Sequence, residues 1–140
     1  MRWAACIAGL WAGVLLGVGL IGAPAGFATA LPEAAGCAAG RMFAQEAYLS
    51  LALALVMCLL LRRRPQGQPE VGAVFSANLM LTLGTLFCTV AGYFALQPMM
   101  AAARAGEGQV SFGTLHLVSA GFFALKTGLV VALAWRLTAG

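Results

Sequence analysis

Charged side chains are scarce in this chain of 140 residues. Lysine and arginine together number 8, acidic residues number 4, and the charged fraction is 9%, against about 25% in ordinary soluble domains. So few charges cannot cover the water-facing surface of a domain of this length. The scarcity therefore excludes a cytosolic enzyme, a disulfide-stapled secreted domain and a disordered chain.

Residues that build metal and redox sites are also few. The chain has one histidine, which cannot supply a bis-histidine haem or a three-ligand zinc site within one chain. Its four cysteines show neither a CxxC motif nor metal-ligand spacing, and no phosphate-binding loop, GxSxG or HExxH motif occurs. We therefore expect no cofactor, no metal, no nucleic-acid partner and no enzymatic activity.

Hydrophobic residues make up 62% of the sequence and are gathered in long runs. Crossing a hydrocarbon core takes about 20 largely apolar residues. Four stretches meet this requirement, at about 3–23, 42–61, 74–97 and 112–137. We expect Pro98 to stop the third and Ser111 to cap the fourth. Because the connections are too short to fold separately, the sequence predicts one all-α domain over residues 1–140, a four-helix transmembrane bundle in a lipid bilayer.

The distribution of basic residues predicts the orientation of the spans. An even number of spans places both termini and the middle loop on one side, which carries Arg2, Arg62, Arg63, Arg64 and Arg136. The other side carries only Arg41 and Arg104. Since cytoplasmic loops are enriched in basic residues, both termini are predicted to be cytoplasmic.

The first apolar run also has features of a secretory signal peptide. Arg2 precedes the run, and Ala28-Thr29-Ala30 follows it as a potential cleavage site. The run of about 20 residues is longer than a typical signal peptide core and carries glycines suited to helix packing. Retention as a transmembrane helix is the favoured interpretation.

Small residues recur at every fourth position of the first span. The stripe consists of Ala5, Gly9, Gly13 and Gly17. Such a stripe lets a neighbouring helix approach closely in lipid. We favour a neighbour within the same chain, and a homodimer is the alternative.

Polar residues line one face of the third span. They are Asn78, Thr82, Thr85 and Thr89. The hydroxyls can bond to carbonyls of their own helix, so a structural role is favoured over a polar path. Asn78 lacks that outlet, and we expect it to bond across a helix interface.

Lys126 is the most informative residue of the fourth span. It lies ten positions before Arg136, which places it about 15 Å deep, near the midplane. An ammonium at that depth costs about 2.5–3.5 kcal/mol and usually faces a bundle interior. The favoured interpretation is a neutral or hydrogen-bonded lysine held against the hydroxyls of Ser119 and Thr85. A substrate- or proton-linked role and simple exposure near a thinned bilayer are the alternatives.

A second polar group is predicted near the opposite surface. Glu46 and His116 each fall four residues into a predicted span, and Tyr93 falls four residues before the end at Gln97. All three would lie about 6 Å below one surface, just beneath Arg41. Such a group can bind an anion, relay a proton or lock helix ends together. Locking is the favoured interpretation.

Several short strings resemble a known family. The chain is similar to the transmembrane protein 205-like family, also called domain of unknown function 4149, over about residues 10–137. The strings are Leu31-Pro32, Gly40-Arg41-Met42-Phe43, Tyr48, Leu96-Gln97-Pro98 and Phe112-Gly113-Thr114-Leu115-His116-Leu117-Val118-Ser119. The resemblance implies a small four-helix membrane protein, bacterial in this Ala- and Gly-rich form, without an established reaction. It also implies that the first helix is retained, and it marks Arg41, Phe43, Tyr48, Gln97, Pro98, His116 and Ser119 as family-like positions.

Two functional hypotheses follow. The first is a non-enzymatic, multi-pass protein of the bacterial inner membrane that serves as an accessory or assembly component of a membrane complex. The second is a small oligomeric transporter or permeation-type protein that uses Lys126 and the group around Glu46 and His116. A membrane-protein partner or a second copy of the chain is expected in either case.

Overall fold

A computed structural model describes residues 2–62 and 76–139 of the chain. The described residues contain helices and no strands, and four continuous helical segments are long and apolar enough to cross a membrane. These segments are Arg2–Thr29, Pro32–Arg62, Ala77–Arg104 and Phe112–Ala139. The predicted all-α fold with four membrane-spanning helices is confirmed. Arg63, Arg64 and the predicted start of the third span at position 74 lie outside the described residues.

The first hairpin consists of two long helical segments. The first segment is α1 (Arg2–Leu16), the π-helical η1 (Gly17–Gly22) and α2 (Ala23–Thr29), which follow one another without a break. The second is α3 (Pro32–Arg62), which opens on a proline, a residue well suited to the first helical position. Both segments extend beyond the predicted spans, and α3 begins ten residues before the predicted start at Met42.

The second hairpin repeats this plan. Its first segment is α4 (Ala77–Thr89), the π-helical η2 (Val90–Ala95) and α5 (Leu96–Arg104), and its second is α6 (Phe112–Ala139). The expectation that Pro98 stops the third span is wrong, because the helix continues to Arg104. A proline ring clashes with the carbonyl four residues earlier, which here belongs to Phe94. That residue lies in η2, where the regular α-helical hydrogen-bond ladder is already interrupted.

The helix ends are closed by local hydrogen bonds. Ser111 Oγ accepts a bond from the backbone N–H of Thr114 at 3.3 Å, which confirms the predicted cap of the fourth span. At the end of α5, Gly106 N–H bonds to Ala103 O and Glu107 N–H bonds to Ala102 O. This pattern is a Schellman motif, and it requires the positive φ of 75° that Gly106 adopts.

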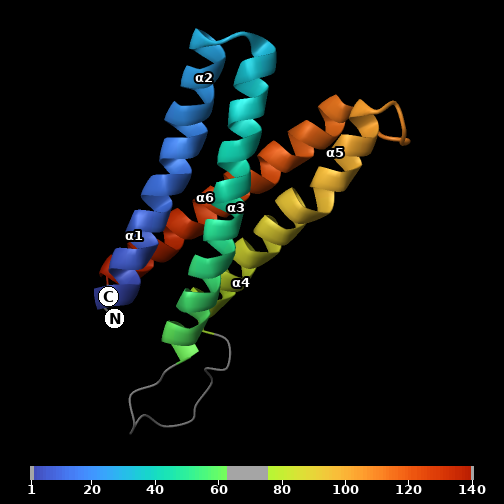
Figure 1. Cartoon of the computed structure of the whole chain (residues 1–140). Helices are drawn as coiled ribbons and strands as arrows, with labels where there is room; N and C mark the ends of the chain where they lie inside the picture. Colours follow the sequence, from blue (N-terminus) through green and yellow to red (C-terminus); the bar gives the residue numbers. More distant parts are fainter. Residues whose placement is uncertain (1, 63–75, 140) are drawn as a thin grey trace, which may run out of the picture.

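The two hairpins pack side by side at one end and diverge at the other (Figure 1). Contacts between them run from α1 to α6 and from α3 to α4. The start of α1 and the end of α6 lie together at the closed end, whereas α2 and α5 lie at the diverging ends. Placing both termini at one end agrees with an even number of spans. Which side of a membrane they face stays a prediction.

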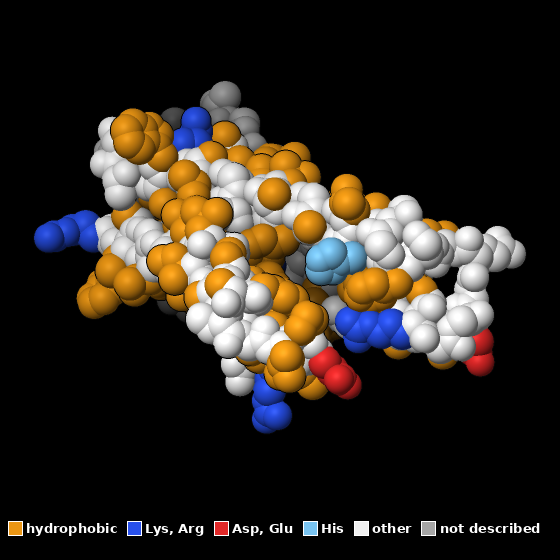
Figure 2. All heavy atoms as spheres, turned by 90° about the horizontal axis from the view of Figure 1, so that it is seen from above, with side chains coloured by type: hydrophobic (Ala, Val, Ile, Leu, Met, Phe, Trp, Pro, Cys, Tyr) orange, Lys and Arg blue, Asp and Glu red, His pale blue; other side chains and the backbone are white. Residues whose placement is uncertain are grey.

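The core lies where the hairpins meet. Its largest buried side chains include Trp11, Leu15, Met57 and Leu133. Outward-facing side chains are mostly apolar, as lipid-facing side chains should be, and Figure 2 shows hydrophobic groups over much of the visible surface. The arrangement therefore buries a small core and leaves a broad apolar exterior.

The buried face of α1 is not the predicted one. Gly9 and Gly13 are exposed, and a Cβ atom added at either would meet no atom within 4 Å. Ala5 and Gly17 are half-buried, and the buried small residues are Ala4, Ala8 and Ala12. The expectation that an internal helix covers the stripe of Ala5, Gly9, Gly13 and Gly17 is therefore wrong for its central glycines. The physical reason is that Trp11 and Leu15 share a face with Ala4, Ala8 and Ala12, and burying these large side chains turns the glycines outward.

Candidate functional site: a buried polar chain across three helices

Lys126 forms an ion pair with Glu46 in the interior of the bundle. Lys126 Nζ lies 2.8 Å from Glu46 Oε1 and 2.7 Å from Oε2, so the ammonium bridges both carboxylate oxygens. The two residues are 3% and 4% exposed. The predicted interior position of Lys126 is confirmed, because the side chain points into the bundle and has found a carboxylate there.

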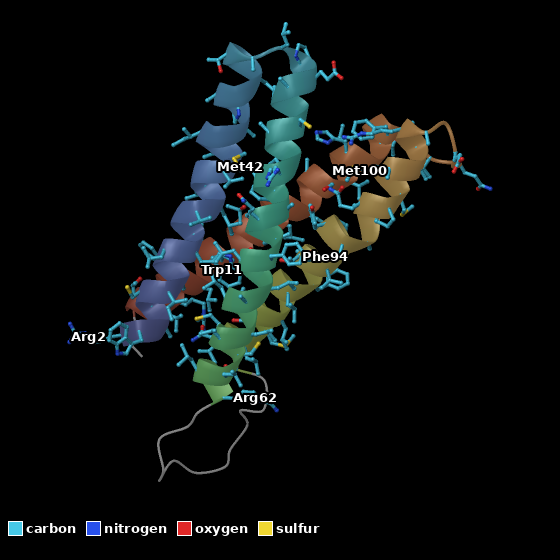
Figure 3. The ribbon with its side chains drawn as sticks, viewed as in Figure 1. Arg2, Trp11, Met42, Arg62, Phe94 and Met100 are labelled. Carbon is cyan, nitrogen blue, oxygen red and sulfur yellow. The ribbon has the colours of Figure 1, made fainter. Side chains whose placement is uncertain are left out.

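Two further side chains extend the pair to a third helix. Ser50 lies one turn after Glu46 on α3, and its hydroxyl donates a short hydrogen bond to Glu46 Oε1. Trp11 of α1 in turn donates from Nε1 to Ser50 Oγ at 2.9 Å. Figure 3 shows Trp11 at mid-height of the bundle. A continuous polar chain, Trp11–Ser50–Glu46–Lys126, therefore connects α1, α3 and α6.

The hydrogen bonds around Glu46 suit a carboxylate paired with an ammonium. Trp11 Nε1 can only donate, so Ser50 Oγ accepts from it and is free to give its own hydrogen to Glu46. Glu46 accepts from Ser50 and twice from Lys126. A carboxylate that accepts from both neighbours, paired with an ammonium, is the arrangement that these contacts suit.

An aromatic ring and a thiol lie close to the pair. The Phe123 ring centre lies 5.0 Å from Lys126 Nζ, within the range of a cation–π contact. Cys88 of α4 is buried and lies close to Lys126. Within the described residues, no buried side-chain nitrogen or oxygen lacks a hydrogen-bond partner. The polar chain is thus fully satisfied by its own members.

The hydroxyls expected to hold Lys126 bond elsewhere. Thr85 Oγ1 donates to Leu81 O, and Ser119 Oγ donates to Gly92 O at 2.7 Å. The interpretation that these hydroxyls hold Lys126 is therefore wrong, and Glu46 replaces them.

The polar face of the third span has the predicted structural role. Thr82, Thr85 and Thr89 each bond back to a carbonyl of their own helix, so they need no partner across the bundle. Asn78 Oδ1 accepts from Arg136 Nε of α6 at 3.0 Å, which is the expected bond across an interface.

The predicted outer group is divided. Glu46 is bonded to Lys126, whereas the exposed His116 stacks on Phe112 with ring centres 5.9 Å apart. The same Phe112 ring lies 4.5 Å from the guanidinium carbon of Arg104. No hydrogen bond or ion pair joins Glu46 to His116 within the described parts of the chain.

Other members of that group lie apart from the ion pair as well. Tyr93 packs edge-to-face on Phe94 at 5.1 Å, and Arg41 and Gln97 are exposed. The grouping failed because α3 begins at Pro32, so Glu46 is the fifteenth residue of its helix and lies deep rather than near the surface. A functional role for Arg41, Tyr93, Gln97, His116 and Ser119 stays a prediction.

Sequence reasoning missed Ser50 and Trp11, although a signal for Ser50 was present. Ser50 lies four positions after Glu46, so the two share a helix face. Trp11 had no such signal, because only the packing of α1 against α3 reveals its partner. Across residues 2–62 and 76–139, no cluster of three or more His, Cys, Asp or Glu side chains could hold a metal ion.

Comparison with known proteins places the sequence in one family. Residues 6–109 match the family described as Domain of unknown function (DUF4149), which confirms the resemblance to domain of unknown function 4149. The match includes the strings around Arg41 and Gln97, and ends before the Phe112–Ser119 string. No curated protein matches the chain, and no solved structure matches it.

Proposed function

The chain belongs to the DUF4149 family, and we propose that it serves as a non-enzymatic accessory or assembly component of a larger membrane complex. The observation that carries this proposal is the open glycine face of α1. Gly9 and Gly13 are exposed, with open space in front of both. Helices in lipid associate where small residues let their backbones approach closely, so this face suits a helix from another chain.

The chain itself uses a glycine for close helix packing elsewhere. A Cβ atom added to Gly92 would overlap Phe122 of α6. The two helices therefore approach each other more closely at Gly92 than an alanine would permit. The same kind of contact is available on α1, and no residue in the described parts of the chain uses it at Gly9 or Gly13. The intramembrane charges, by contrast, are occupied with one another. These features support a stable scaffold that offers a docking helix.

Co-purification tests the proposal. A tagged chain would be purified in gentle detergent from its native membranes and analysed by mass spectrometry and absorbance. We expect a stoichiometric partner or a bound pigment with the parent, and loss of it in Gly9→Leu/Gly13→Leu. The matched control is Gly121→Leu/Gly128→Leu on α6, two exposed glycines that also face open space. A colourless homo-oligomer without another protein would contradict the accessory role.

The buried ion pair favours a second candidate, a small oligomeric transporter or permeation-type protein. Ionisable residues within membrane spans often mark paths for ions and substrates, and Lys126 and Glu46 connect the two hairpins. Purified protein in liposomes would be assayed for proton and solute flux. Lys126→Leu should abolish it, and His116→Ala tests whether the separate His116 takes part. Full flux in both variants, or none in the parent, would exclude this candidate.

We also propose the bacterial inner membrane as the location, with both termini in the cytoplasm. The excess of arginine at the end that holds Arg2, Arg62 and Arg136 supports this orientation. Trp3 and Trp135 are exposed near the same end, where interfacial aromatic residues are favoured.

A further inference from the structure

The carboxylate of Glu46 lies among hydrogen-bond donors supplied by other residues. Lys126 Nζ donates to both of its oxygens, and Ser50 Oγ donates to Oε1. Trp11 fixes the direction of the Ser50 hydroxyl by donating to its oxygen. An ammonium and an oriented hydroxyl that converge on one carboxylate form the donor set of an anion site, and this site is occupied by the chain's own side chain.

We propose that Lys126 and Ser50 form a binding site for a small monovalent carboxylate anion, which Glu46 occupies until it takes up a proton. This inference goes beyond the docking role and does not depend on it. The anion class follows from the occupant, because the present ligand of the donors is a carboxylate held by one positive charge.

Charge balance couples the proton to the anion. The ionised pair is neutral, so one proton added to Glu46 leaves the Lys126 ammonium without a counter-charge in the bundle interior. Such a charge is costly in a membrane. One external anion bound at Lys126 restores neutrality, and the protonated Glu46 side chain no longer competes for the ammonium. The exchange therefore takes one proton and one anion together.

The groups that face the pair allow this exchange. From α4, Cys88 is the other titratable side chain close to Lys126. From α1 the facing polar group is Trp11, which does not titrate, and from α3 it is Ser50. Glu46 is thus the one carboxylate at the site within the described residues, and its protonation controls the charge there.

Glu46 and Lys126 occupy matching positions in two hairpins of similar construction. Glu46 is the fifteenth residue of α3, and Lys126 is the fifteenth residue of α6. Both α3 and α6 follow a helical segment that contains one π-helical stretch. This stretch begins after the 15 residues of α1 in the first hairpin and after the 13 residues of α4 in the second. The pair therefore joins equivalent positions of two similar hairpins, at their interface. Transporters built from repeats bind substrates and coupling ions at such an interface.

Trp11 provides an internal probe for the test. The other tryptophans, Trp3 and Trp135, are exposed, so Trp3→Phe/Trp135→Phe leaves Trp11 as the single tryptophan, which can be excited selectively at the red edge of its absorption. Formate, the smallest carboxylate, is the probe ion, and gluconate, a much bulkier carboxylate, is the matched control salt. Emission of the purified protein is recorded during titration at about pH 5 and about pH 8.

We expect the single-Trp parent to respond to formate and not to gluconate. Its apparent affinity should be higher at about pH 5 than at about pH 8, since the exchange takes up a proton together with the anion. Glu46→Ala should respond equally at both pH values, and Glu46→Ala/Lys126→Met should lose the response.

Three results would overturn the proposal. They are a folded Glu46→Ala protein that is silent to formate, a parent response that does not depend on pH, and a response that survives the loss of Lys126. If Glu46→Ala does not fold, the parent titration alone decides, because it needs no variant at the site. Association with a partner through α1 has a separate readout, so failure here leaves the accessory role standing.

Discussion

Lys126 and Glu46 each carry a charge into a region where a lone charge costs about 2.5–3.5 kcal/mol. At 2.7 Å the pair cancels most of that penalty for both residues. The free-energy cost of removing both charges from water nevertheless offsets much of their mutual attraction, so the net stabilisation from the pair is small. The pair therefore matters to stability chiefly because the loss of one partner costs much more free energy than the loss of both.

That asymmetry gives a prediction at the residue scale. Lys126→Leu should destabilise the bundle by about 3–5 kcal/mol, because it leaves the Glu46 carboxyl group buried without its partner. Glu46→Leu/Lys126→Leu should lie close to the parent, since neither charge remains. Unfolding of the detergent-solubilised protein by SDS, followed by circular dichroism, measures both. A double variant as unstable as the single one would mean that the pair itself, and not the orphaned carboxyl group, carries the stability.

The sequence predicted the position of Lys126 but not its partner. Its depth follows from counting residues to Arg136 in a helix whose end is well marked. Glu46 was assigned to the surface because hydropathy places a span start at Met42, although the helix extends outward to Pro32 through small and polar residues. Apolar composition marks what lies in lipid, and it does not mark where the helix begins.

Among the helical elements, α4 and η2 pack closely against α6. Gly92 lies in η2, and Phe122 of α6 lies directly against it. A Cβ atom added at Gly84 would lie 3.2 Å from a side-chain carbon of Leu129. Ser119 Oγ bonds to Gly92 O at the same place. The small residues Gly84, Cys88 and Gly92 recur at every fourth position, so this span holds the stripe that the chain uses internally.

Gly92→Ala tests that contact. The new Cβ would overlap Phe122, and overpacking of this kind costs about 1–3 kcal/mol. Gly121→Ala in α6 is the matched control, because its added Cβ faces open space. Thermal unfolding in detergent should separate the two variants. Equal stability would show that α4 and α6 can move apart without cost.

Gly106 gives a second prediction for the elements. It ends α5 with a φ of 75°, which an alanine adopts only at a cost of about 1 kcal/mol. Gly106→Ala should lower stability by that amount, whereas Gly113→Ala, a helical glycine in open space, should not. Thermal denaturation of the two variants checks this. A stable Gly106→Ala protein would mean that the turn accepts another conformation.

The sequence pattern predicted which segments are helical better than it predicted which face of each helix is buried. Two stripes of small residues compete on α1, one built on glycines and one on Ala4, Ala8 and Ala12. A shift of one residue turns a helix by about 100°, and Trp11 decides between them by bonding to Ser50. A contact between distant residues is invisible to a pattern within one helix.

At the scale of the whole molecule, orientation is open to direct measurement. Cys37 is exposed near the start of α3, at the end away from the chain termini. With both termini cytoplasmic, a membrane-impermeant maleimide should label Cys37 in intact cells when Cys6, Cys58 and Cys88 are replaced by serine. A cysteine in a C-terminal tag should react only after lysis. The reverse pattern would invert the orientation.

The equivalence of the hairpins has a consequence for how such a protein can assemble. Two identical hairpins related by a twofold axis would set Glu46 against Glu46, or Lys126 against Lys126, and like charges repel. An attractive pair at this position needs two different hairpins in a ratio of one to one. Joining them in a single chain guarantees that ratio, so the opposite charges act as a recognition code between the two halves of one polypeptide.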